Sequence, residues 1–184
     1  KELDLAKKYL EEGDYEKATN AFLDLIEKDP NQADCYNGLG VIAYYWKQYD
    51  EAYGDLTEII AENQEIYMER ALELCLLISY DNNEDFGAAF RHAEQLNQVT
   101  LNNYLKTLAQ RYGLVAAYKT NNTQGVADMA RQLKNNPDAE SRYKIKAQHY
   151  LGKLAYENGD HGTALQAFQE VVDAPGAEDA SEAM

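Results

Sequence analysis

The sequence Gly13-Asp14-Tyr15-Glu16-Lys17-Ala18 indicates a repeat protein, because related sequences occur twice more along the chain. It returns in looser form as Gln48-Tyr49-Asp50-Glu51-Ala52 and again as Gly159-Asp160-His161-Gly162-Thr163-Ala164. The alanines that close these motifs, together with Ala89 and Ala127, are separated by 34, 37, 38 and 37 residues. A period of this length indicates an array of helix-turn-helix repeats.

Turn residues and apolar spacing agree with helices throughout. Gly13 and Gly159 can adopt the positive φ that ends a helix, and Asp14, Asp85, Thr123 and Asp160 can cap the helix that follows. Apolar residues recur at intervals of three and four, which gives each helix one buried face. Helices are therefore predicted over residues 2–11, 15–28, 33–46, 49–62, 65–80, 85–97, 100–119, 123–135, 139–157 and 161–173.

The repeats resemble the tetratricopeptide repeat (TPR), whose pattern is W-x2-L-G-x2-Y, then A-x3-F, then P. The first, second and last repeats carry most of the match. Matching residues are Leu5, Ala6, Tyr9, Ala18, Phe22 and Pro30; Tyr36, Leu39, Gly40, Ala43, Ala52 and Leu56; and Leu151, Gly152, Ala155, Ala164 and Phe168. The pattern is weaker between residues 66 and 136, where the assignment depends on the period.

This resemblance implies an all-α fold, a right-handed superhelical solenoid of about five helix-turn-helix repeats. The repeats are expected near residues 1–32, 33–66, 67–99, 100–137 and 138–176, in a single solenoid domain. Residues 177–184 are expected to begin a further helix. Since the chain begins with Lys1 and residues 177–184 lie where a sixth repeat would begin, both ends look cut, and we expect a piece of a longer protein. Solenoids need terminal caps with a polar outer face, and the C-terminus lacks a convincing one, so homodimerisation through this uncapped end is a further expectation.

Small residues are expected where the two helices of a repeat cross closely, at positions 8 and 20 of the unit. Gly40 and Gly152 meet this demand at position 8 of the second and fifth repeats. Leu77 and Val115 occupy the same position in the two middle repeats and do not meet it.

The charge distribution excludes several functions. The formal net charge is −15, of which residues 1–100 carry −14 and residues 101–184 carry −1. Nucleic-acid binding needs clustered positive charge and is not expected. No apolar run approaches the roughly 18 residues of a membrane span. The compartment stays open: a soluble domain, either cytoplasmic or exported and anchored through a segment missing from this chain.

Two short motifs resemble cofactor or metal sites, but each lacks a feature that its site requires. Residues 38–43 match G-x-G-x-x-A, yet that motif needs a preceding strand. Residues 81–85 resemble the start of a calcium loop, but its sixth and twelfth positions hold Phe86 and His92. No nucleophile, base and orienting acid assemble. We therefore expect no catalysis, no metal and no cofactor.

The resemblance implies a partner-binding concave groove, lined by the first helix of each repeat. The predicted lining residues are Asn37, Val41, Tyr44, Tyr45, Leu74, Ile78, Tyr112, Lys119, Lys146, His149, Lys153 and Tyr156. Tyrosines combine a large contact area with a hydroxyl group, and the lysines could hold acidic side chains or a terminal carboxylate. The alternative is that several of these tyrosines pack between repeats and that the lysines and His149 are solvated.

The leading hypothesis is a non-catalytic scaffold that binds a peptide or helix of a partner protein in this groove. The carboxylate clamp of co-chaperone TPR domains is absent, since its positions hold Leu3, Lys7, Gly38, Ala71 and Cys75. Two further hypotheses remain: a structural or self-associating segment of a longer solenoid, and a regulatory module that binds a small ligand.

Overall fold

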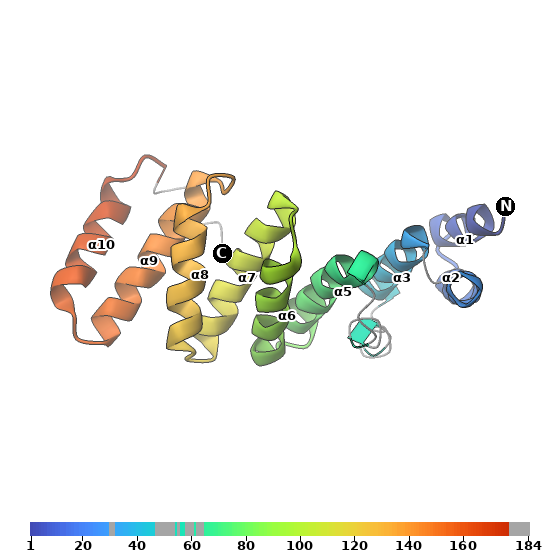
Figure 1. Cartoon of the computed structure of the whole chain (residues 1–184), viewed down its shortest axis with the longest axis horizontal. Coiled ribbons are helices and arrows are strands. Elements are labelled where there is room, and N and C mark those ends of the chain that lie inside the picture. The colour runs from blue at the N-terminus through green and yellow to red at the C-terminus, as the bar shows by residue number, and fades with distance from the viewer. Residues whose placement is uncertain (30–31, 47–53, 55, 58–60, 62–64, 177–184) are drawn as a thin grey trace. The chain divides into compact units, whose positions relative to one another are not determined.

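The structure is a computed structural model that describes residues 1–29, 32–46, 54, 56, 57, 61 and 65–176. The described residues form helices and turns and no strand (Figure 1). The elements are α1 (Glu2–Glu11), α2 (Tyr15–Lys28), α3 (Ala33–Trp46), α5 (Glu65–Leu77), the π-helix η1 (Ile78–Asn82), α6 (Phe86–Val99), α7 (Asn103–Lys119), α8 (Thr123–Asn135), α9 (Ser141–Glu157) and α10 (His161–Asp173). Most of the predicted helix 49–62 lies outside the described residues, as does the further helix expected at 177–184.

The chain forms two compact units, residues 1–83 and residues 84–184, and each is described by itself. In unit 1, α2 packs against both α1 and α3. Ala6, Ala18 and Phe22 are fully buried between them. Gly38 is required in α3 because the ring of Phe22 occupies the space that a Cβ would fill.

In unit 2 each helix from α6 to α9 packs against the next one along the chain, as Figure 1 shows from green to red. Its core includes Leu114 on α7, Val126 and Leu133 on α8, and Tyr150 on α9. Apolar residues of adjacent helices therefore share one continuous interior, as expected for stacked helical repeats.

Local turn chemistry sets the helix starts. Asp14, Asp85 and Asp160 each accept a hydrogen bond from the backbone N–H three residues later, as predicted. The prediction for Thr123 was wrong: Asn122 caps α8, its side chain accepting from Gly125 N, and Thr123 is the first helical residue. Gly13 and Gly159 have φ of 75° and 78°, which L side chains rarely adopt.

The predicted helix 65–80 is α-helical only to Leu77 and continues as a π-helix to Asn82. Ser79 Oγ donates to Cys75 O at 2.6 Å, and Asn83 N donates to Ile78 O, five residues back. Serine back-bonding of this kind competes with the α-helical ladder. Wider turns follow, as in other π-bulges.

No helix of the described residues combines the length and the apolar content that crossing a bilayer requires.

Candidate functional site

The predicted groove residues of the second repeat all lie on α3. The side chain of Val41 is half-buried. The side chains of Asn37, Tyr44 and Tyr45 lie outside the described part of the structure. Their place in the groove therefore stays a prediction.

The two predicted residues of the third repeat are buried. Leu74 on α5 and Ile78 on η1 are 5% and 1% exposed. Leu74 packs against Gly40 of α3 so closely that a Cβ at Gly40 would overlap it. Both side chains contribute to helix packing within unit 1, because apolar residues on the first helix of a repeat can serve the core as well as a groove.

The predicted residues of the last repeat follow one side of α9 at intervals of three and four. Tyr156 is 61% exposed, and its ring meets that of His161 edge-on with centroids 5.4 Å apart. Lys146 is 9% exposed, and burial lowers the pKa of its ammonium group. Among the predicted residues of the last repeat, Lys146 is thus the least accessible to a partner.

Lys153 joins α9 to α7 through tyrosine rings. Its Nζ lies 4.3 Å from the ring centroid of Tyr118 and 5.5 Å from that of Tyr150. The two rings meet edge-on, with centroids 5.1 Å apart. Tyr118 Oη also donates to Glu157 Oε1 at 3.1 Å. Tyr118, Tyr150 and Lys153 form what we call the tyrosine–lysine cluster, in which cation–π contacts fix the lysine head group.

His149 borders this cluster and faces α10. Its ring centroid lies 5.7 Å from that of Phe168 and 6.2 Å from that of Tyr150. Burial lowers the pKa of His149, and the charges of Lys153 and Lys146 lower it further. The imidazole is therefore neutral at pH 7 and offers one donor and one acceptor.

The predicted residues of the fourth repeat have other neighbours. Tyr112 is half-buried, and the guanidinium of Arg111 lies 5.8 Å from the ring centroid of Tyr112. Lys119 is exposed, and its Nζ lies 4.3 Å from the ring centroid of Phe86. The residue of α7 that contacts Lys153 is Tyr118, which was not among the predicted lining residues.

Arg111 forms a second contact between α7 and α9. Its guanidinium lies 3.8 Å from the ring centroid of Tyr143, and that of Arg142 lies 4.7 Å from the same centroid. The prediction missed all three residues. The sequence signal for these contacts would have been the Arg-Tyr pair that each helix contains, at residues 111–112 and 142–143.

Both helices are basic in a chain of net charge −15. α7 carries Lys106, Arg111 and Lys119 and no acidic residue. α9 carries four basic residues, Arg142, Lys144, Lys146 and Lys153, against a single acidic one, Glu157. The first helices of the last two repeats thus concentrate positive charge, which attracts acidic partners.

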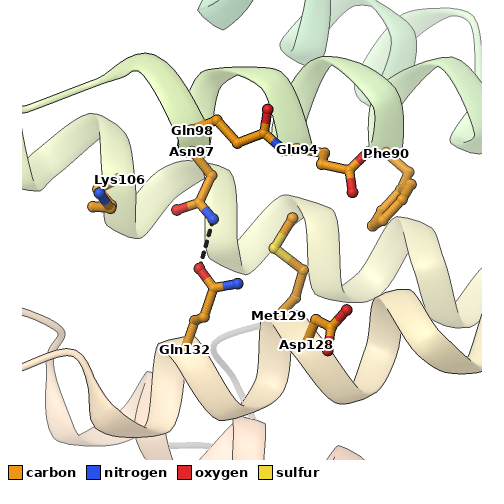
Figure 2. Close-up of a pocket in the computed structure, with 8 residues that line it drawn as sticks. All are labelled: Phe90, Glu94, Asn97, Gln98, Lys106, Asp128, Met129 and Gln132. Atoms are coloured by element: carbon orange, nitrogen blue, oxygen red, sulfur yellow. Dashed lines mark hydrogen bonds between the residues drawn. The ribbon is translucent and has the colours of Figure 1, made fainter.

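Sequence reasoning also missed a cavity of about 460 Å³ on unit 2 (Figure 2). Residues of α6, α7 and α8 line it: Phe90, Glu94, Asn97, Gln98, Lys106, Asp128, Met129 and Gln132. Asn97 Nδ2 donates to Gln132 Oε1 at 2.7 Å across the cavity, from α6 to α8. Sequence motifs could not predict this site, because residues of three separate helices form it.

The chemistry of the described residues gives little scope for metal binding. They contain no group of three or more His, Cys, Asp or Glu placed to hold a metal ion. The two cysteines are buried, and burial raises the pKa of Cys75 to about 12. A thiol with so high a pKa is a poor nucleophile at pH 7.

Comparison with known proteins identifies the class of the chain. One family model of the tetratricopeptide repeat matches residues 3–64, and a second matches residues 146–175. The chain belongs to the tetratricopeptide repeat family, and its predicted all-α solenoid fold is confirmed. TPR proteins typically bind protein partners, so the chain is a repeat scaffold of the protein-interaction class.

A solved structure supports the fold over nearly the whole length. The crystal structure of nearly identical TPR-like repeats from a Podosopora anserina protein, described as a kinesin light chain, covers 92% of this chain and 90% of its own. The TM-score is 0.55 and the sequence identity is 16%. At this identity the similarity concerns the fold alone. None of the curated proteins matches the chain.

Proposed function

We propose that the chain binds an acidic segment of a partner protein along α7 and α9, the first helices of its last two repeats. The tyrosine–lysine cluster is the observation that supports this proposal. It presents a cation held between aromatic rings, and aromatic residues are enriched in protein interfaces. The predicted groove residues of α3, in unit 1, are a separate part of the proposal.

The chemistry of α7 and α9 favours an acidic segment or a terminal carboxylate. In the described part of the structure, neither Lys153 nor Arg111 has a carboxylate within ion-pair distance. A carboxylate of a partner could therefore pair with either charge. Their stacking on rings orients the head groups before a partner arrives. Pre-organisation of this kind lowers the entropic cost of binding.

Replacing Lys153 with alanine is expected to weaken the binding of acidic peptides about tenfold, or about 1.4 kcal/mol. The change removes the cation and leaves both rings of the cluster in place. The measurement uses a peptide array graded in net charge, followed by fluorescence anisotropy with the most strongly retained acidic peptide. Retention should rise with the negative charge of the peptide and fall with added salt.

Lys153→Arg and Lys8→Ala are the matched controls. Arginine keeps a charge that can stack on Tyr118, so Lys153→Arg should restore most of the affinity. Lys8 is an exposed lysine of α1 with the same formal charge, and its loss should have little effect. Equal affinity for all three variants and the native chain would rule out the cluster as the binding surface.

A second candidate function, self-association, is supported by the outer side of α10. Leu165 and Val172 are 71% and 72% exposed and stand seven residues apart, on the same side of the helix. Phe168 lies between them and is half-buried. Exposed apolar residues in one line are typical of surfaces that pack against another helix.

If this surface joins two copies, Leu165→Gln combined with Val172→Gln should abolish the concentration dependence of the mass measured by light scattering. Helical content should stay unchanged, because neither side chain is buried. The matched control is Leu23→Gln, which alters an exposed leucine of α2. A native chain that is monomeric at every concentration would eliminate self-association.

A further inference from the structure

We propose that the cavity between α6 and α8 binds a basic residue that carries a free carboxylate, as at the C-terminus of a peptide ending in Arg or Lys. This inference does not require the tyrosine–lysine cluster, although the cavity shares one residue of α7, Lys106, with the basic surface. It depends on the direction of a hydrogen-bond chain that ends at the cavity, and on opposite charges at the two ends of the cavity.

The hydrogen-bond chain starts at a backbone group whose role is fixed. Asp138 N–H can only donate, and it donates to Asn136 Oδ1 at 3.0 Å. The other end of that amide, Asn136 Nδ2, must then donate, and it does so to Gln110 Oε1 at 2.9 Å. Asn136 and Gln110 are both buried, so their amide orientations are set by these bonds and not by solvent.

The same direction continues to the cavity. Gln110 Nε2 donates to Asn97 Oδ1 at 3.2 Å, and Asn97 Nδ2 donates to Gln132 Oε1 at 2.7 Å. Since the oxygen of Gln132 accepts, its Nε2 is the group left to meet a ligand. The chain therefore places a fixed N–H donor in the middle of the cavity, suited to a carboxylate oxygen.

Lys106 provides a positive charge beyond this donor. Figure 2 shows Lys106 at one end of the cavity and Phe90, Glu94 and Asp128 toward the other. In the described part of the structure, Lys106 has no carboxylate within ion-pair distance. In Figure 2 Lys106 and Gln132 Nε2 lie on opposite sides of the Asn97–Gln132 hydrogen bond, so a ligand carboxylate placed over that bond would accept from Gln132 Nε2 and face the charge of Lys106.

The opposite end suits a cation. Figure 2 shows the carboxylates of Glu94 and Asp128 toward the same end of the cavity as the ring of Phe90, and Met129 provides an apolar wall between the two ends. Asp128 Oδ1 accepts from Gln124 Nε2 at 2.9 Å, which leaves its second oxygen for a ligand. The ring is held in place, since a Cβ at Gly125 would come within 2.8 Å of Phe90 Cζ. A guanidinium or ammonium can therefore pair with carboxylates and stack on a ring.

The size and the order of charges select the ligand. A volume of about 460 Å³ falls within the range of small-molecule sites, roughly 300–1,000 Å³. An Arg or Lys side chain supplies an apolar stem that separates the cation from the carboxylate. A free amino acid would also place its α-ammonium near Lys106, where like charges repel. A C-terminal residue, whose nitrogen is part of an amide, avoids this repulsion.

Isothermal titration calorimetry with four small probes tests the proposal on the full chain. Nα-acetyl-arginine, which mimics a C-terminal arginine, is expected to bind most tightly. Arginine should bind about tenfold more weakly because of its α-ammonium, and argininamide and Nα-acetyl-citrulline weaker still, because each lacks one of the two charges. No saturable heat with Nα-acetyl-arginine would overturn the proposal. Tighter binding of free arginine would overturn the assignment to a C-terminus.

Variants locate the binding to the cavity. Glu94→Gln combined with Asp128→Asn should weaken Nα-acetyl-arginine at least about tenfold. Lys106→Met should remove the preference for Nα-acetyl-arginine over argininamide, which lacks the carboxylate. All three residues are at least partly exposed, so the fold should persist, as circular dichroism would verify. Glu27→Gln on α2 is the matched control. Affinity that is unchanged in both cavity variants would place any binding elsewhere and overturn the proposal.

Discussion

Replacing Gln110 with leucine is expected to lower the free energy of unfolding by about 2–4 kcal/mol. Gln110 is 3% exposed and lies in the middle of the buried hydrogen-bond chain of unit 2. Leucine would leave Asn97 Oδ1 without its donor and Asn136 Nδ2 with only Thr107 Oγ1, at 3.2 Å. A buried amide that loses its partner costs about 1–3 kcal/mol.

Urea unfolding followed by far-UV circular dichroism measures this loss. The chain has a single tryptophan, Trp46, and it belongs to unit 1, so its fluorescence follows that unit separately. The matched control is Gln124→Leu, which alters an exposed glutamine and should change stability by less than about 0.5 kcal/mol. Because paired removal of both partners can be nearly neutral, Gln110→Leu with Asn97→Leu should recover part of the loss.

An unfolding midpoint for Gln110→Leu equal to that of the native chain would mean that these bonds do not hold unit 2 together. The same variant also tests the orientation of Gln132. Without Gln110, nothing fixes the amide of Asn97, and the affinity of the cavity for Nα-acetyl-arginine should fall with the stability of the chain.

The helix bounds could be predicted from sequence because the signals that set them are local. Asp14 and Asp160 directly precede the helices that they cap, and Gly13 and Gly159 follow the ends of helices with a positive φ. Such signals act within about four residues. For this reason α1, α2 and α10 match the predicted ranges; α3 and α8 match as well, although the cap of α8 is Asn122 and not the predicted Thr123.

The site was harder to predict because its contacts join distant residues. Gln110 reaches Asn97 across 13 positions and Asn136 across 26, and Asn97 reaches Gln132 across 35. In the sequence each of these looks like an ordinary polar surface residue. Burial decides the role of Asn97, Gln110 and Asn136, and burial depends on how the helices cross.

The register of α7 shows how one crossing residue alters the choice of site residues. Positions counted from Ala127 place Val115 at the crossing and select Tyr112 and Lys119. In the structure, Gly113 is buried where α7 passes α6 and α8, and Val115 is half-buried. Tyr118 stands five residues after Gly113, as Tyr45 stands five residues after Gly40. Counting from the glycine would therefore have selected Tyr118, the residue that contacts Lys153.

Gly113→Leu should consequently destabilise the chain by about 3 kcal/mol, through overpacking. Even a Cβ at this position would come within 3.1 Å of both Ala93 Cβ and Met129 Cε, so a larger side chain must separate α7 from α6 and α8. The gain in helix propensity from losing glycine, at most about 1 kcal/mol, does not offset this. Thermal unfolding followed by circular dichroism would measure the change.

Val115→Ala and Gly113→Ala separate the crossing residue from its neighbours. If Gly113 is the crossing residue, Val115→Ala removes only half-buried methyl groups and should cost about 1 kcal/mol. Gly113→Ala requires both Ala93 and Met129 to shift by a few tenths of an ångström, and should cost less than Gly113→Leu. A Gly113→Leu variant as stable as the native chain would contradict the close approach of α7 to α6 and α8. It would also remove the physical basis for placing Tyr118, and not Tyr112, in the tyrosine–lysine cluster.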